Sequence, residues 1–263
     1  MQLQINGKAA FAYTAAHDVD PSKPTVVFVH GAGLDHSWWG LQSRYFGYHG
    51  FNVLAVDLPG HGRSDGPPLA SIEGMSDWIL ALLNASKIEK SVLVGHSMGS
   101  LIALEFAARY PDRAQKLALI GTAYPMKVSD AYLDAAKRND QAAYDMETIW
   151  GHAAQVPFAG NPNPGMWMYG DTLARLSRLA PGVLHTDLVA CNAYAGGMEA
   201  AARVTCPALF VVGARDVMTP PRAAQALAGA IAGSTTVTIA PSGHSLMAEA
   251  PDATLDALIG FLS

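Results

Sequence analysis

Five short runs of aliphatic residues constrain the fold of this chain more than any other feature of its sequence. None of them alternates apolar with polar residues, and several end at a glycine or at a polar residue. Strands that are apolar on both faces belong inside a parallel sheet that helices cover on each side. The runs occupy residues 26–29, 53–56, 92–94, 117–120 and 209–212.

Longer segments with helical periodicity separate these runs. Residues 71–86 place apolar side chains three to four positions apart, and residues 98–110 are apolar on most faces. The alternation of strands with helices predicts an α/β fold with a doubly wound, mostly parallel sheet. Near the N-terminus, the pair Asn6-Gly7 between two short apolar stretches predicts an antiparallel hairpin.

One long stretch, from residue 123 to residue 195, breaks this rhythm because it holds no convincing core strand. It contains helical patches, a loop rich in Pro, Gly and Asn at 158–165, and many large apolar side chains. An insertion of this size between two core strands predicts a helical lid, with additional helical packing as the alternative. We therefore expect a core of residues 1–122 and 196–263, with a helical lid of residues 123–195 inserted between two core strands.

The composition is that of a globular protein. Half of the 263 residues are hydrophobic, 15% are charged, and the formal net charge is −5 without any cluster of Lys and Arg. This argues against a nucleic-acid partner. The apolar runs are too short to span a bilayer, and the N-terminus lacks the pattern of a signal peptide, so we expect a soluble cytoplasmic protein. Cys191 and Cys206 are expected to be buried thiols rather than a disulfide.

The motif that carries chemistry is Gly95-His96-Ser97-Met98-Gly99, which follows one apolar run and opens a helical segment. A G-x-S-x-G sequence between a strand and a helix is the pattern of a nucleophile elbow. The glycines are needed because the turn is sharp, and side chains at 95 or 99 would clash with neighbouring elements. Ser97 is therefore the candidate nucleophile.

A serine hydroxyl near neutral pH needs a base within hydrogen-bond reach, and the base needs an orienting acid. His244 stands in a loop after the last expected strand, at the same edge of the sheet as Ser97. Asp216 follows the run at 209–212, and the chain order Ser, Asp, His is the order expected for such a site. We predict a triad of Ser97, Asp216 and His244.

An acyl-transfer transition state also needs two N–H donors for its oxyanion. One is expected from the backbone of Met98, directly after the nucleophile. The other is expected from Ala32, in the sequence His30-Gly31-Ala32-Gly33 after the first core strand. The alternative for that second loop is an ordinary glycine turn.

Four blocks give the sequence a close resemblance to the α/β-hydrolase superfamily. They are His30-Gly31-Ala32-Gly33, the loop 57–65, the elbow 95–99 and Ser242-Gly243-His244. The resemblance implies a mostly parallel sheet of about eight strands, with residues 123–195 as a helical cap inserted after the sixth strand. It implies a mainly structural role for the loop 57–65. It also favours a serine-nucleophile, carboxylesterase-like branch, since relatives that open epoxides or remove halides use a carboxylate nucleophile.

The expected activity is hydrolysis of a carboxylic ester or lactone of a small to medium apolar substrate, through an acyl-enzyme and without metal or organic cofactor. Alternatives that keep the triad are thioester hydrolysis, carbon–carbon cleavage of a diketone, hydroxynitrile cleavage and perhydrolysis. A ligand receptor that does not turn over is a further alternative. Trp150, Met166 and Trp167 are the candidate pocket residues, although they can equally form the core of the cap. The sequence leaves the natural substrate and the oligomeric state open.

Overall fold

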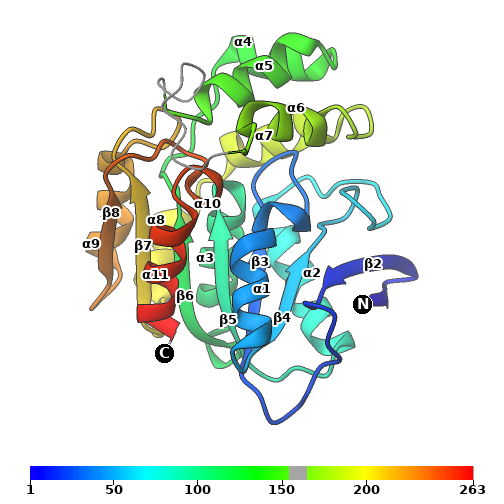
Figure 1. Ribbon diagram of the computed structural model, residues 1–263, viewed down its shortest axis with the longest axis vertical. Coiled ribbons are helices and arrows are strands. Elements are labelled where there is room, and N and C mark those ends of the chain that lie inside the picture. Colours follow the sequence, from blue (N-terminus) through cyan, green and yellow to red (C-terminus); the bar gives the residue numbers. More distant parts are fainter. Residues whose placement is uncertain (154–164, 263) are drawn as a thin grey trace.

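In the computed structural model, which describes residues 1–153 and 165–262, the strands form a single eight-stranded sheet (Figure 1). The strands are β1 (Gln2–Ile5), β2 (Lys8–Tyr13), β3 (Thr25–Val29), β4 (Asn52–Val56), β5 (Ser91–His96), β6 (Ala114–Ile120), β7 (Ala208–Gly213) and β8 (Thr235–Ile239). Their order is β1-β2-β4-β3-β5-β6-β7-β8. Only the pairs β1–β2 and β2–β4 are antiparallel, so the predicted mostly parallel sheet is confirmed.

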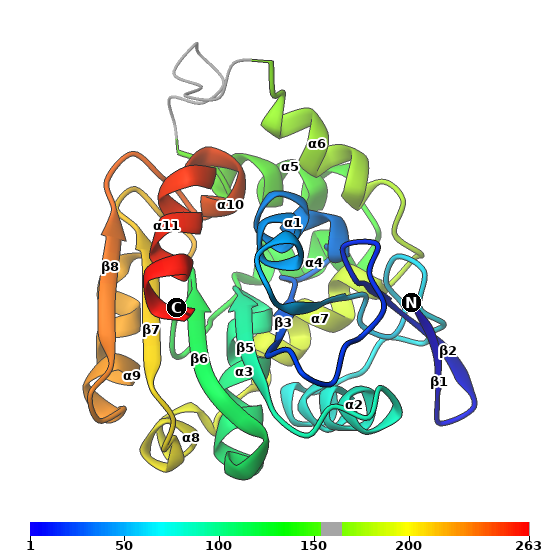
Figure 2. The ribbon, with the colours of Figure 1, turned by 60° about the horizontal axis from the view of Figure 1, so that its bottom comes forward.

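Helices cover both faces of the sheet, as Figures 1 and 2 show. One face carries α1 (Gly40–Tyr48) and α11 (Pro251–Leu262). The opposite face carries α2 (Ile72–Ala85), α3 (Met98–Arg109), α8 (Gly197–Arg203) and α9 (Gln225–Ala230). The short α10 (Leu246–Glu249) precedes α11. None of the helices in the described ranges is both long enough and apolar enough to cross a bilayer.

Strand β3 shows why the apolar runs do not alternate with polar residues. Val26 and Phe28 pack in the core on the α1 side, while Val27 and Val29 pack in the core on the α3 side. All four side chains are fully buried. A strand buried on both faces needs apolar residues at every position, which is what the sequence pattern predicts.

The predicted N-terminal hairpin is also confirmed. β1 and β2 pair antiparallel around Asn6 and Gly7, whose φ angles are 52° and 77°. A two-residue hairpin turn of this kind requires positive φ at both central residues, and Asn and Gly are the residues that tolerate it best.

Between β6 and β7 the chain forms a group of helices above the edge at which the parallel strands end (Figure 1). They are α4 (Asp130–Lys137), α5 (Gln141–Trp150), α6 (Met168–Leu176) and α7 (Val183–Ala193). Within residues 123–153 and 165–195 the structure has no strand, in agreement with the sequence. Most of the loop at 158–165 lies outside the described residues.

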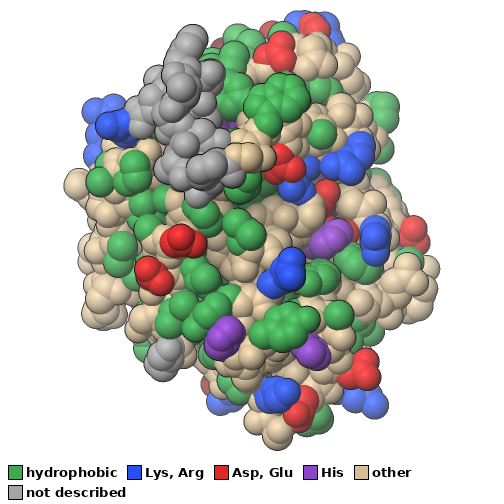
Figure 3. Space-filling view, in the orientation of Figure 1, with side chains coloured by type: hydrophobic (Ala, Val, Ile, Leu, Met, Phe, Trp, Pro, Cys, Tyr) green, Lys and Arg blue, Asp and Glu red, His purple; other side chains and the backbone are tan. Residues whose placement is uncertain are grey.

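The visible surface carries charges of both signs. Figure 3 shows Lys and Arg side chains interspersed with Asp and Glu over the face drawn there. The prediction that nucleic acid is not a partner stays a prediction, since surface charge bears on it only indirectly.

Candidate active site

Ser97 lies in the sharp turn between β5 and α3, with φ 51° and ψ −120°. Positive φ is strained for a residue with a side chain. No residue with a side chain fits at the two flanking glycine positions. A Cβ on Gly95 would lie 2.1 Å from the carbonyl oxygen of Gly99, and a Cβ on Gly99 would lie 2.3 Å from the carbonyl oxygen of Val29. The expected clash at positions 95 and 99 is thus confirmed. The Ser97 N–H donates to the carbonyl of Ile120, 3.0 Å away, which holds the turn at the end of β6.

The structure brings His244 and Asp216 together from loops after two neighbouring strands, β8 and β7. The Nδ1 of His244 lies 2.8 Å from Oδ2 of Asp216. Thr219 joins them: its hydroxyl donates to the same oxygen at 2.6 Å and lies 2.9 Å from His244 Nδ1. The other carboxylate oxygen accepts from the N–H groups of Met218 and Thr219. The Asp216 carboxylate is therefore held in one orientation toward the imidazole.

This arrangement sets the charges of the pair. Burial by itself would raise the pKa of Asp216, but the adjacent His244 and the hydrogen bonds from Thr219 lower that pKa to about 2. Burial likewise opposes a charged His244, yet the attraction of Asp216 outweighs it and raises the pKa of His244. An aspartate that stays ionised next to a histidine of raised pKa suits a general base, because the cation formed on proton uptake is stabilised.

Ser97 and His244 both line one cavity of about 350 Å³. The Nε2 atom of His244 is buried and makes no hydrogen bond to any part of the protein that the structure describes. The other ring nitrogen, Nδ1, is paired with Asp216, so Nε2 is the nitrogen of this ring that remains available to accept a proton. Hydrogen bonds between the reacting groups of an active site are often long in the substrate-free enzyme and shorten when substrate binds.

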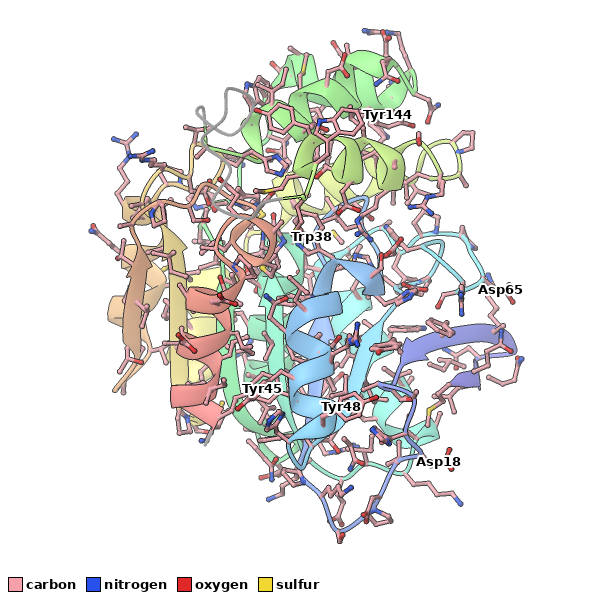
Figure 4. All side chains as sticks on the ribbon, in the orientation of Figure 1. Asp18, Trp38, Tyr45, Tyr48, Asp65 and Tyr144 are labelled. Atoms are coloured by element: carbon pink, nitrogen blue, oxygen red, sulfur yellow. The ribbon has the colours of Figure 1, made fainter. Side chains whose placement is uncertain are left out.

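His96, next to the candidate nucleophile, contacts the backbone of the candidate base, His244. It is buried, and its Nε2 lies 3.0 Å from the backbone carbonyl of His244, to which it can donate. Burial, followed by the neighbouring His244, lowers the pKa of His96 well below its usual value, so the ring is neutral. Its ring also lies 5.9 Å from that of Trp38, which Figure 4 shows beneath the inserted helices.

The loop with the expected oxyanion donors is tied to α7 by Asp187. This carboxylate is fully buried, and its Oδ2 accepts from the N–H of Gly33 at 2.9 Å and faces His61 Nε2 at 2.8 Å. The Nδ1 of His61 faces the carbonyl of Pro59 at 3.1 Å. Both ring nitrogens of His61 face acceptors, which favours the protonated ring, and the attraction of Asp187 outweighs burial and raises the pKa of His61. Ala32, directly before Gly33, lines the cavity.

The second expected donor, the N–H of Met98, lies at the first position of α3. An N–H at this position has no acceptor inside the helix, and the helix dipole favours negative charge there. Ala32 lies in the loop after β3, and Met98 directly follows Ser97 at the start of α3.

The histidine loop is tied to the end of α5 in a similar way. The carboxylate of Glu249 accepts from the N–H of Ala153 at 2.9 Å and from the N–H of Gly243 at 3.1 Å. The N–H of Ser245 donates to the carbonyl of Gly151 at 2.8 Å. The residues on both sides of His244 are therefore fixed by the segment that follows α5.

The cavity lies between α4, α5 and α7 and the loops of the sheet edge. Its lining includes Trp150, one of the three expected pocket residues. The structure places the other two elsewhere, which corrects that expectation: Met166 lines a different hollow, and Trp167 is 77% exposed beside the start of α6. Apolar composition identified the right segment, but the direction of a side chain depends on how its helix packs. Residues that line the cavity and were not anticipated include Met126, Tyr132, Glu147, Leu188 and Cys191.

One group of residues has the donor types of a metal site, namely Asp35, His36 and Asp57, with ligand atoms within 4.8 Å of one another. Their atoms already serve the loops. The Asp57 carboxylate accepts from the N–H groups of His36 and Arg63, and Asp35 accepts from the N–H of Ser37 at the start of a 3₁₀ turn. Through these hydrogen bonds the group stabilises the surrounding loops, which accounts for its clustering.

Comparison with known proteins places the chain in a family. The family described as the Alpha/beta hydrolase family matches residues 26–257. The chain belongs to the alpha/beta hydrolase family. Among curated relatives, this alpha/beta hydrolase is 30% identical to the pimeloyl-[acyl-carrier protein] methyl ester esterase of Chromobacterium violaceum, over 75% of this chain and 78% of that protein. It is 26% identical to the (E)-2-((N-methylformamido)methylene)succinate hydrolase of Acinetobacter baylyi, over 81% of this chain and 79% of that protein.

Among solved structures, the enol-lactonase from Burkholderia xenovorans LB400 superposes with a TM-score of 0.88 at 24% identity, covering 100% of this chain and 99% of that one. At this level of identity the likeness concerns the fold. The sequence-based assignment to the α/β-hydrolase superfamily is confirmed.

Proposed function

We propose that this protein is a serine hydrolase that cleaves a carboxylic ester or lactone of a small to medium substrate. The observation that carries the proposal is the shared cavity. Ser97, in a strained elbow, lines the same cavity as His244, and the Nδ1 atom of His244 is hydrogen-bonded to Asp216. The relatives named as a methyl ester esterase and as a hydrolase support hydrolytic chemistry.

In the proposed mechanism, Ser97 Oγ attacks the substrate carbonyl while His244 Nε2 takes its proton. The oxyanion receives hydrogen bonds from the N–H groups of Ala32 and Met98. His244 then protonates the leaving alcohol and afterwards activates a water molecule that releases the acid from Ser97. Asp216 keeps the imidazole in the tautomer that leaves Nε2 unprotonated and stabilises its cation. The inserted segment 123–195 serves as the cap that covers this site.

The decisive test replaces the proposed nucleophile and, as a control, the cysteine that lines the same cavity. Ser97→Ala is expected to lower kcat for a p-nitrophenyl ester by at least about three orders of magnitude. Cys191→Ala is expected to change it by only a few-fold, because burial raises the pKa of the Cys191 thiol far above its usual value and keeps it protonated. A fluorophosphonate probe should label Ser97, with the modified residue located by mass spectrometry.

A panel of substrates separates the remaining reactions that the same triad can perform. It contains p-nitrophenyl esters, an acyl thioester and a vinylogous diketone. Hydrolysis of the diketone or thioester without turnover of any ester would overturn the ester proposal. A single slow turnover with every substrate would point to a receptor.

A further inference from the structure

The substrate cavity contains a carboxyl group that the proposed mechanism does not use. Glu147, on α5, lines the cavity together with Ser97 and is only 9% exposed. Its Oε2 accepts a short hydrogen bond from the hydroxyl of Tyr132, on α4. The Tyr132 ring lies edge-on to that of Trp150, with centroids 5.9 Å apart, which fixes its position.

The second oxygen of this carboxyl, Oε1, has no hydrogen-bond partner within the described ranges, and it is not sealed away from the cavity. The cavity lining includes the apolar Met126 and Leu188 and also Trp150, whose indole N–H is a donor, but no hydrogen bond joins any of them to Oε1 in the described ranges. A carboxyl group in an apolar wall needs more than one hydrogen bond to offset its desolvation. Lys127 and Ser129 also line the cavity, but neither is hydrogen-bonded to Glu147, so a polar group of a bound substrate can serve as the partner of Oε1.

We propose that Glu147 and Tyr132 form a polar subsite that takes a hydroxyl or primary amide group of the substrate, at a distance from the ester that Ser97 attacks. This rests on the proposed function and narrows its substrate class. A hydroxyl or primary amide both donates and accepts, so it can pair with the carboxyl whether ionised or protonated. An alkyl group at this place leaves Oε1 unpaired, and a carboxylate meets like charge when Glu147 is ionised.

Glu147 and the proposed base, His244, influence each other's pKa. Burial raises the pKa of Glu147, while the Tyr132 hydrogen bond and the nearby His244 act in the opposite direction. In turn, Glu147 contributes, after Asp216, to the raised pKa of His244. Polar substrate groups bound at Glu147 thus lie within electrostatic reach of the catalytic imidazole.

The test compares pairs of p-nitrophenyl esters whose acyl chains have equal numbers of heavy atoms and end in either a hydroxyl or a methyl group. For the chain length that reaches Glu147, kcat/KM should favour the hydroxyl ester by at least about tenfold, since a site built for a hydrogen bond rejects the analogue that lacks it. Glu147→Gln keeps a donor and an acceptor and should retain the preference. Glu147→Met should abolish it.

Met126→Leu, another change in the cavity wall, should alter both esters of a pair by the same factor. Equal kcat/KM within every pair for the wild-type protein would overturn the proposal, as would a preference that survives in Glu147→Met.

A second measurement does not depend on hydrolysis. Methyl ketones with the same two chain ends are titrated by calorimetry into the wild-type protein and into Glu147→Gln. Tighter binding of the hydroxyl ketone to both proteins is expected, and equal affinities for the two ketones would overturn the subsite. If no ester is turned over while the hydroxyl ketone still binds more tightly, the proposed reaction fails but the subsite stands.

Discussion

His244 is the residue whose ionisation should govern activity. As a general base it must be neutral before reaction. Burial lowers the pKa of His244, but the attraction of Asp216 outweighs burial, so the pKa is raised. The fraction of active enzyme therefore falls as the pH drops through a value above the ordinary histidine pKa of about 6.5.

We predict that kcat/KM for a p-nitrophenyl ester has an acidic limb with an apparent pKa above about 6.5. Asp216→Asn removes the charge that stabilises the imidazolium, so the limb should move to lower pH while kcat falls by about four orders of magnitude. Imidazole proton shifts of His244, followed by NMR across the same pH range, check the assignment. Thr219→Ser keeps the hydroxyl and serves as the matched control. A limb that stays in place in Asp216→Asn would contradict the prediction.

At this scale the sequence predicted the residues whose roles follow from local pattern and missed those defined by contacts across the fold. Ser97 could be found from its glycines, and His244 and Asp216 from their positions after strands. Thr219 had a weaker signal, three residues after an aspartate in a turn. Asp187 had none, because its partner His61 lies 126 residues away along the chain.

Among the inserted helices, α7 contacts the loop that carries Ala32, an expected oxyanion donor. Its Asp187 accepts from the N–H of Gly33 in that loop and pairs with His61, whose pKa it raises, within the buried interior. Removing one partner of such a pair leaves a charge unpaired, which typically costs about 3–5 kcal/mol.

We predict that Asp187→Asn lowers the free energy of unfolding by about that amount, 3–5 kcal/mol, and also lowers kcat, because the Ala32 N–H loses its fixed position. Urea unfolding followed by circular dichroism measures the first effect, and ester hydrolysis measures the second. Glu199→Gln, an exposed acid on α8, is the control and should change neither. Unchanged kcat in folded Asp187→Asn would show that the oxyanion loop does not depend on α7.

The inserted helices also show where prediction from sequence ends. The helical character of the segment was predictable from composition and spacing, but the set of side chains facing the cavity was not. Trp150 faces it, whereas Trp167 is exposed at the start of α6. Which face of a short helix is buried depends on its partners, and α5 and α6 find those partners only in the folded protein.

The whole molecule holds buried ionised groups of both signs, so its stability should depend on pH in two directions. Asp216 has a pKa lowered to about 2 despite burial, so its contribution is present above about pH 4 and is lost as the pH falls toward 2. His61 has a raised pKa because Asp187 outweighs burial, so its contribution is complete below about pH 6.5 and is lost as the pH rises through its folded value.

We predict that the free energy of unfolding, measured in urea at a series of pH values, is highest between these two declines. In Asp187→Asn the decline on the alkaline side should become smaller, because His61 no longer has its anionic partner. An equally steep alkaline decline in this variant would assign that effect to other groups.

The architecture as a whole was the most predictable level. Continuous apolar runs dictated strands buried on both faces, and their alternation with helical segments dictated a parallel arrangement. The antiparallel hairpin followed from Asn6 and Gly7. Strand β3 shows why these inferences hold. It is buried on both faces, so every position needs an apolar residue, and this requirement can be read directly from a short stretch of sequence.

The ties at Asp187 and at Glu249 have a consequence for engineering this fold. Exchanging the inserted helices for those of a relative would also remove the anchors of the loops that carry Ala32 and His244. A chimaera built at the segment borders would fold around an intact sheet and still lose its alignment of reacting groups. In a successful graft, Asp187 and residues 151–153 should therefore be kept from this protein and not replaced by those of the relative.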